Sequence, residues 1–491
     1  MRIGERDARA RPHGAAPGAI RPIGRRATTF DAGDAAGAQG ETWPIARPTA
    51  RVPVWPLFLL GFALLCLGLL IGPRLATEDE AGYNCVGSVA LTDPFGFELN
   101  CDSPEFMWLA RDPAGLLDHV NSRQSRPALI LLAALIAAPL SRIAPPDGPP
   151  TPVYQGLYDP ARVAATFDRD RPAYLAYILL NFAIVLASFH MLRRAVERRH
   201  PVRGGADAII LAATGLLLVA NDVTKAFLWS PHTQLFNILV PVLAVYATQR
   251  VIADRRLERS FALAIGAVLG FGMLAYPAFA VIAVCLLPPA AVGALCQPLA
   301  SARRRDLASL GMLALLSAAP SALWYAYLHV AAAQISYAEL NLREVVWMKD
   351  ALAQGLGTLS AQWLDYLGQL LAFAAPQALA LVALIAWLAG TLVFAVPRQG
   401  VPPARRTAAW PMVAVGVYVS CAMLGFYTCV GYIVPRLAYP ALPPLIVAAG
   451  AAAMAIGQRL PARPRAILAA GCVAVAVAQV IFEVVKPGPW S

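Results

Sequence analysis

Twelve apolar segments, most of them close to 20 residues long, dominate the chain from residue 54 onward. A helix needs about 20 apolar residues to cross the roughly 30 Å hydrocarbon core of a bilayer. Only 14% of the residues are charged, whereas a soluble protein carries about 25%. The sequence therefore predicts an all-α, polytopic helical membrane protein. The segments lie near 54–72, 127–144, 173–192, 207–221, 233–249, 261–277, 278–297, 307–328, 369–397, 409–427, 440–458 and 467–485.

The loops between these segments differ in charge, which predicts the side of the membrane that each occupies. One alternate set of loops holds 18 basic residues and the other holds four. Because basic residues concentrate in cytoplasmic loops, we expect the first set inside, with a disordered basic cytoplasmic tail at 1–53. The net charge of +11 fits this bias, and no basic recognition element indicates nucleic-acid binding. We expect a multi-pass protein of the inner (plasma) membrane.

A single transmembrane domain, 54–491, accounts for the rest of the chain. Its predicted outer loops are 73–172, which is the longest, 222–232, 329–368 and 428–439. The 329–368 loop is typical of an amphipathic helix at the membrane interface. Cys85 and Cys101 both fall in the first outer loop, where an extracytoplasmic location would permit a disulfide; their spacing alone leaves the pairing open.

Segment 127–144 breaks the alternation of sides. The basic tail predicts that 54–72 runs outward, and the arginines of 193–203 predict that 173–192 runs inward. The segment between them is short and contains Pro139. We therefore expect a re-entrant or membrane-lying helix here and eleven spans in total. The alternative is that 127–144 spans the membrane and that one later assignment is wrong.

Three consecutive acids, Glu78, Asp79 and Glu80, follow the first apolar segment at a membrane boundary. A carboxylate held just above the bilayer can take a proton from an acceptor hydroxyl or bind a metal. The alternative is a solvated helix end, because acids stabilise helix N-termini.

A second polar cluster contains Asp222, Lys225 and His232 within a loop of about a dozen residues. Asp222 is a candidate to share a metal or substrate with Asp79, and Lys225 and His232 are candidates to hold a phosphate. A purely structural loop is the alternative.

Three arginines in the predicted outer loops are further candidates for phosphate binding. Arg436 is the only charge in its loop, close to Tyr439, and the planar guanidinium of arginine matches phosphate geometry. Arg123 and Arg126 precede the short segment at 127–144. The alternatives are an interfacial, snorkelling Arg436, and contact of Arg123 and Arg126 with ordinary lipid headgroups.

These motifs resemble the GT-C superfamily of polytopic glycosyltransferases, which includes protein O-mannosyltransferases and lipid A aminoarabinose transferases. That family places an acidic motif followed by tyrosine in the first outer loop, and Asp-Glu-Ala-Gly-Tyr at 79–83 is similar. Asp222 matches an acid of the second outer loop. Arg436 with Tyr439 is similar to an Arg-Tyr entry before a late span, although Leu437 and Ala438 separate the two residues. The resemblance also implies a surface helix near 104–118.

The resemblance implies a polyprenyl-phosphate-linked sugar donor, and a lipid, glycan or protein acceptor at the outer face of the membrane. Inversion would occur by direct displacement. Asp79 would orient or deprotonate the acceptor hydroxyl, assisted by Glu80 or Asp222. Arg436, Lys225 and His232 would stabilise the departing phosphate. No cofactor is established by the sequence; some family members use a divalent metal, and the metal requirement stays open.

Two other functions remain as alternatives. An O-antigen-type polymerase or ligase also uses polyprenyl-linked sugars, but its long loop falls late in the chain. A secondary transporter or lipid flippase would carry ionisable groups near the bilayer midplane. Here the spans are nearly free of charge and the polar clusters sit at one face, which favours an interfacial enzyme.

Overall fold

The computed structural model describes one compact unit within 49–491. The described residues are 53–72, 87–92, 95–99, 102–118, 123–143, 145, 167, 169–254, 257–297, 299–331, 336–394, 410–431 and 433–486. The predicted tail as far as residue 52, the acids Asp79 and Glu80, and the pair Cys85 and Cys101 lie outside this set.

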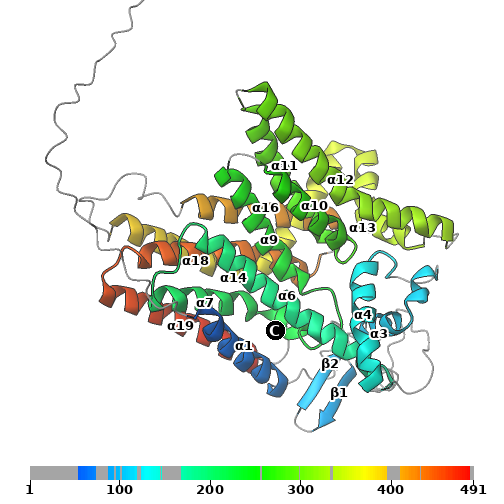
Figure 1. The fold of residues 1–491 in the computed structure, drawn as a ribbon, viewed down its shortest axis with the longest axis horizontal. Coiled ribbons are helices and arrows are strands. Elements are labelled where there is room, and N and C mark those ends of the chain that lie inside the picture. The colour runs from blue at the N-terminus through cyan, green and yellow to red at the C-terminus, as the bar shows by residue number, and fades with distance from the viewer. Residues whose placement is uncertain are drawn as a thin grey trace, which may run out of the picture. The chain divides into compact units, whose positions relative to one another are not determined.

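All twelve predicted apolar segments contain a helix, so the all-α polytopic fold is confirmed (Figure 1). Among the described residues, eight helices are long and apolar enough to cross a membrane, and the bent α14 would make nine. Three further apolar helices, α4, α7 and α10, have 15 to 17 residues, so the number of crossings stays a prediction. The helices are α1 Val54–Ile71, α4 Pro127–Ile143, α6 Arg171–Glu197, α7 Gly205–Val219, α9 Phe236–Asp254, α10 Arg259–Met273, α11 Ala280–Leu295, α12 Ala300–Ala331, α14 Leu356–Phe394, α16 Trp410–Val430, α18 Leu442–Gly457 and α19 Ala462–Val485.

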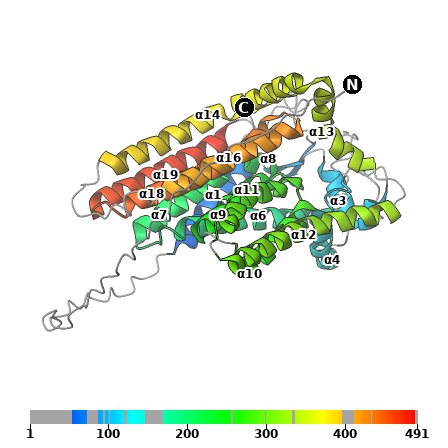
Figure 2. The same ribbon diagram turned by 90° about the horizontal axis from the view of Figure 1, so that it is seen from above.

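Helix α18 is the central helix of the bundle, and all of its residues are buried. It packs against α7, α9, α14 and α16, and α14, α16, α18 and α19 run alongside one another in Figure 2. Its alanines and glycines allow this close approach, as small residues do at membrane helix interfaces. Helices α1 and α19 instead expose large apolar side chains, such as Leu60 and Ile467, as expected of faces that contact lipid.

The Gly266-x-x-x-Gly270 pattern lies at the contact between α10 and α12, as expected for a helix-packing motif. A Cβ atom added at Gly270 would stand 2.2 Å from the backbone oxygen of Leu316 and 2.7 Å from Cγ of Pro320. Only glycine permits this separation of the two backbones.

Short elements gather at one end of the bundle, where α9 begins and α16 ends. We call this end the site end; it is formed by 102–118, 123–126, 220–237, 277–279, 427–431 and 433–441. The elements are α3 Ser103–Arg111, η1 Pro113–Leu117, α8 Asp222–Phe227, η2 Pro277–Phe279, α17 Pro435–Ala438 and η3 Tyr439–Ala441. The opposite end, where α6, α9 and α18 end and α12 begins, carries the described arginines of 193–203, 303–305 and 459–465, and we call it the basic end.

Two predictions about the outer loops have different outcomes. The helix expected near 104–118 is present as α3 and η1, but its surface location is wrong, because eight of the nine α3 residues are buried and α3 packs on α4 and α6. The first loop also contains an unpredicted antiparallel hairpin, β1 Gly87–Thr92 and β2 Phe95–Leu99, in which Gly87 pairs with Leu99. The 329–368 loop includes a helix, α13 Ser336–Gln354; its location at the membrane interface stays a prediction.

Candidate functional site

The loop between α8 and α9 is held in place by two asparagines. Asn221 caps α8, with its side-chain oxygen accepting a backbone hydrogen bond from the first turn at 2.9 Å. Asn181, buried on α6, donates its amide to the carbonyls of Phe227, Leu228 and Ser230 at 2.9 to 3.1 Å. A buried amide satisfied in this way fixes the backbone around it, and this positions the residues that follow.

His232 has both ring nitrogens engaged within the protein. Nδ1 accepts a hydrogen bond from the backbone N–H of Gln234 at 3.2 Å, so Nε2 carries the proton and donates to Asp102 at 3.1 Å. Burial lowers the pKa of His232 to about 4, with Asp102 opposing the shift and Arg436 and Arg123 adding to it. The imidazole is therefore neutral at pH 7, and neither nitrogen is left for the phosphate contact predicted from the sequence.

Arg123 is neutralised by two acids at the start of α3, Asp102 at the N-cap position and Glu105 in the first turn. Its guanidinium lies 2.5 Å from Asp102 and 2.9 Å from Glu105, and it covers the Phe106 ring at 4.8 Å. Burial alone would raise the pKa of Asp102, but the Arg123, His232 and Arg126 side chains outweigh it and hold that pKa well below its usual range. Arg123 thus ties α3 to the turn that precedes α4.

Arg126 and Arg436 line one cavity of about 120 Å³ at the site end. Arg126 donates to the hydroxyl of Thr233 at 2.9 Å. In the described part of the chain, the buried Nε atoms of both arginines lack a hydrogen-bond partner, and neither guanidinium forms an ion pair. The cavity far exceeds the roughly 10–15 Å³ that one water requires, so it admits a polyatomic group. Its lining is Arg126, Gln234, Tyr276, Pro277, Ala278, Phe426, Tyr427, Val430, Arg436 and Leu437.

Asn237 organises the polar wall of this cavity. Its side-chain oxygen accepts from the hydroxyls of Tyr276 and Tyr427, at 2.7 and 2.8 Å. Its amide donates to Gln234 at 2.6 Å and reaches the backbone carbonyl of Arg436 at 3.5 Å. Because the described lining contains two cations and no acid, the cavity suits an anion, and guanidinium groups bind phosphate or carboxylate oxygens with directional hydrogen bonds.

Three other predicted residues lie in a second buried cluster at the C-terminal end of α19. Asp222 pairs with Lys486, which is 3.2 Å from Glu483. Lys225 donates to the backbone carbonyls of Glu483 and Lys486. Tyr439 donates its hydroxyl to a backbone carbonyl of α7 at 3.2 Å. These contacts fasten α8 and η3 to the bundle, and none of the three residues lines the arginine cavity.

The structure thus brings Arg123, Arg126, His232 and Arg436 together at the site end. Sequence reasoning missed several residues of the two clusters. Asp102 and Glu105 stand three positions apart and so share one face of a helix, and Glu483 is an acid inside an apolar segment; both patterns could have been recognised. Tyr276, Tyr427 and Asn237 carry no such signal, because each is a single residue within an apolar stretch.

The described residues contain no group of three side chains that could hold a metal ion. The acidic motif at 79–83, the expected metal or proton-accepting group, lies outside these residues. Comparison with models of known protein families gave no match, and comparison with curated proteins gave none.

Proposed function

We propose that this protein is a membrane glycosyltransferase that transfers a sugar from a polyprenyl-phosphate donor to an acceptor hydroxyl, with inversion at the anomeric carbon. One observation carries the proposal: Arg126 and Arg436 line the same cavity, and the buried Nε of each has no partner among the described residues. Both arginines are half-buried, and neither forms an ion pair among the described residues. Partly burying a cation without an acidic partner is costly, and an anionic ligand offsets that cost. The phosphate of a lipid-linked sugar is such a ligand.

The reaction needs one bond to form as another breaks. The acceptor oxygen bonds to the anomeric carbon while the bond from that carbon to the phosphate oxygen breaks, and the phosphate departs with the electron pair. Arg126 and Arg436 stabilise the growing negative charge, as preorganised donors do. The acceptor proton passes to Asp79, with Glu80 assisting, as the GT-C resemblance implies.

The remaining predicted residues hold neighbouring helices and loops in place and do not act on the reacting atoms. Arg123 and His232 hold α3 and the α8–α9 loop beside the cavity. Asp222, Lys225 and Tyr439 fasten α8 and η3. We assign these five residues positioning roles.

Charge supports an outer location for the cavity. Helix α9 carries Asn237 in its first turn at the site end and Arg250 near its last turn at the basic end. Because basic loops concentrate on the cytoplasmic side, the basic end would be cytoplasmic and the cavity would face outward. We propose the plasma membrane as the location, with the N-terminus inside.

Mass spectrometry of envelope glycans and glycolipids tests this function. The strains are a deletion and the deletion restored with wild type, Arg436→Gln, Asp79→Asn or Arg304→Gln at matched protein levels. Arg304 is exposed at the basic end of α12 and is the control for loss of an arginine. We expect one sugar mass to vanish in the deletion, to return with wild type and Arg304→Gln, and to stay strongly reduced with the other two.

Two outcomes would contradict the proposal in different ways. Full restoration by Arg436→Gln and Asp79→Asn would refute both residue roles. If the deletion changes no glycan, sugar transfer is refuted, and the transporter or flippase alternative takes its place.

A further inference from the structure

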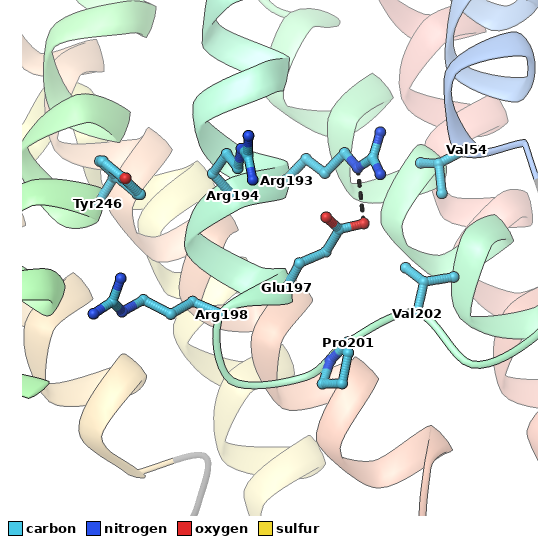
Figure 3. Close-up of a pocket in the computed structure, with 8 residues that line it drawn as sticks. All are labelled: Val54, Arg193, Arg194, Glu197, Arg198, Pro201, Val202 and Tyr246. Carbon is cyan, nitrogen blue, oxygen red and sulfur yellow. Dashed lines mark hydrogen bonds and ion pairs between the residues drawn. The ribbon is translucent and has the colours of Figure 1, made fainter. Parts of the chain in front are cut away.

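A second, larger cavity lies at the basic end of the bundle, away from the arginine cavity. Its volume is about 510 Å³, and it lies between the start of α1, the end of α6 and the later part of α9 (Figure 3). Its lining is Val54, Arg193, Arg194, Glu197, Arg198, Pro201, Val202 and Tyr246.

The three arginines of this cavity differ in their partners. Arg193 donates to Glu197 at 2.7 Å, as the dashed line in Figure 3 marks. Arg198 donates to Asp254 at 2.6 Å. Arg194 makes no hydrogen bond or ion pair within the described residues, and in Figure 3 its guanidinium lies between Tyr246 and Arg193. One arginine of the cavity is therefore available to a ligand.

The surroundings of the cavity add positive charge. Buried His200 lies two residues beyond Arg198; burial lowers its pKa to about 4, and nearby Arg459, Arg199 and Arg203 push it in the same direction. Burial is the main cause of this shift; the three arginines add to it and Asp207 opposes it, so cations outnumber acids around His200. An anion entering the cavity therefore meets a favourable field in addition to direct contact with Arg194.

The position of Trp55 indicates the depth of the cavity in the membrane. This residue follows Val54 in the first turn of α1, and its ring stacks on His190 at 6.3 Å and meets Phe189 edge-on at 5.0 Å. Tryptophan concentrates at the membrane–water interface. The cavity therefore lies at the level of the lipid headgroups, with Val54, Pro201 and Val202 as its apolar wall.

We propose that this cavity binds the phosphate of a membrane phospholipid, held by Arg194 and oriented by Tyr246. The lipid tails would follow the apolar wall into the bilayer, and basic pockets between helices on the cytoplasmic side bind anionic headgroups in this way. A soluble phosphate offers the same chemistry without the tails. This site is independent of sugar transfer.

Ligand-dependent thermal unfolding of the full-length protein in detergent tests the proposal. The probes are phosphatidylglycerol, phosphatidylcholine with the same chains, and inorganic phosphate. A ligand that binds only the folded protein raises the unfolding temperature, and at a given concentration a tighter ligand raises it more. The variants are Arg194→Gln and the control Arg304→Gln. Each replaces an exposed arginine that has no hydrogen-bond or ion-pair partner among the described residues. We therefore expect both variants to unfold like wild type when no ligand is added.

We expect phosphatidylglycerol to stabilise wild type and Arg304→Gln more than phosphatidylcholine does. Arg194→Gln should bind phosphatidylglycerol about tenfold more weakly, the effect of losing one charge-assisted contact. Stabilisation by inorganic phosphate with the same dependence on Arg194 would support the site and identify soluble phosphates as its ligands. Equal affinity of wild type and Arg194→Gln for every probe would overturn the proposal.

Discussion

Replacing Arg123 with glutamine tests whether the buried charges beside the arginine cavity hold the site end together. The Arg123 side chain is 4% exposed and bridges Asp102 and Glu105, which are 16% and 2% exposed. Glutamine keeps a hydrogen-bond donor but removes the charge. The two carboxylates then lose the cation that they share.

The burial of the Arg123 ion pairs sets the expected loss in the free energy of unfolding. Breaking a buried ion pair by removing one partner costs about 3–5 kcal/mol, because the other charge stays uncompensated. A matched surface pair should behave differently: Arg193 and Glu197 are 31% and 21% exposed, and an exposed pair of this spacing contributes only about 0.3–0.5 kcal/mol. We therefore expect Arg123→Gln to lower the free energy of unfolding several times more than Arg193→Gln does.

Denaturant titrations of the protein in one detergent, without added phospholipid and followed by tryptophan fluorescence, measure both values. The pH dependence adds a second criterion. Because Arg123 lowers the pKa of Asp102, the stabilisation that it provides is present above the ordinary carboxyl pKa of about 4 and is lost at lower pH. The deficit of Arg123→Gln should therefore shrink on acidification. A deficit equal to that of Arg193→Gln, at every pH, would refute the buried network.

Three further changes probe other buried contacts. His232 has a pKa of about 4 in the folded protein against about 6.5 unfolded, so acidification from pH 6.5 to 4 should cost wild type about 3 kcal/mol. Unfolding titrations across this range should show no such loss in His232→Gln. If the unfolding free energy of His232→Gln falls with pH as steeply as that of wild type, the lowered pKa of His232 is refuted. Lys486→Met should cost about 3–5 kcal/mol by removing the cation that pairs with buried Asp222; a double-mutant cycle with Asp222→Asn should show strong coupling, and additive effects would exclude the pair. Gly270→Val should cost about 1–3 kcal/mol through overpacking against α12, measured by thermal unfolding with exposed Gly311→Val as control, and equal losses would argue against the close contact.

The amino-acid sequence alone determined the helical framework. Each apolar segment forms a helix, because backbone groups in a bilayer must be hydrogen-bonded within the segment itself and local hydropathy therefore suffices. The Gly266-x-x-x-Gly270 contact is also readable from local sequence, because small residues at helical spacing mark a packing face. Arg436 was identifiable as a phosphate candidate because it is the only charge in its predicted loop, and Arg126 because it directly precedes an apolar segment.

Only the tertiary structure decided which of these polar residues meet. Arg126 and Arg436 come from opposite halves of the sequence and share a cavity, whereas Asp222 and His232, ten residues apart in one loop, belong to different clusters. The partners that decide this, Lys486 for Asp222 and Asp102 for His232, are distant in sequence. The order in which helices pack depends on the fit between whole side-chain surfaces, which no local pattern contains. Burial and charge compensation follow from that packing, and they distinguish Arg436, which forms no ion pair among the described residues, from Arg123, which bridges two acids.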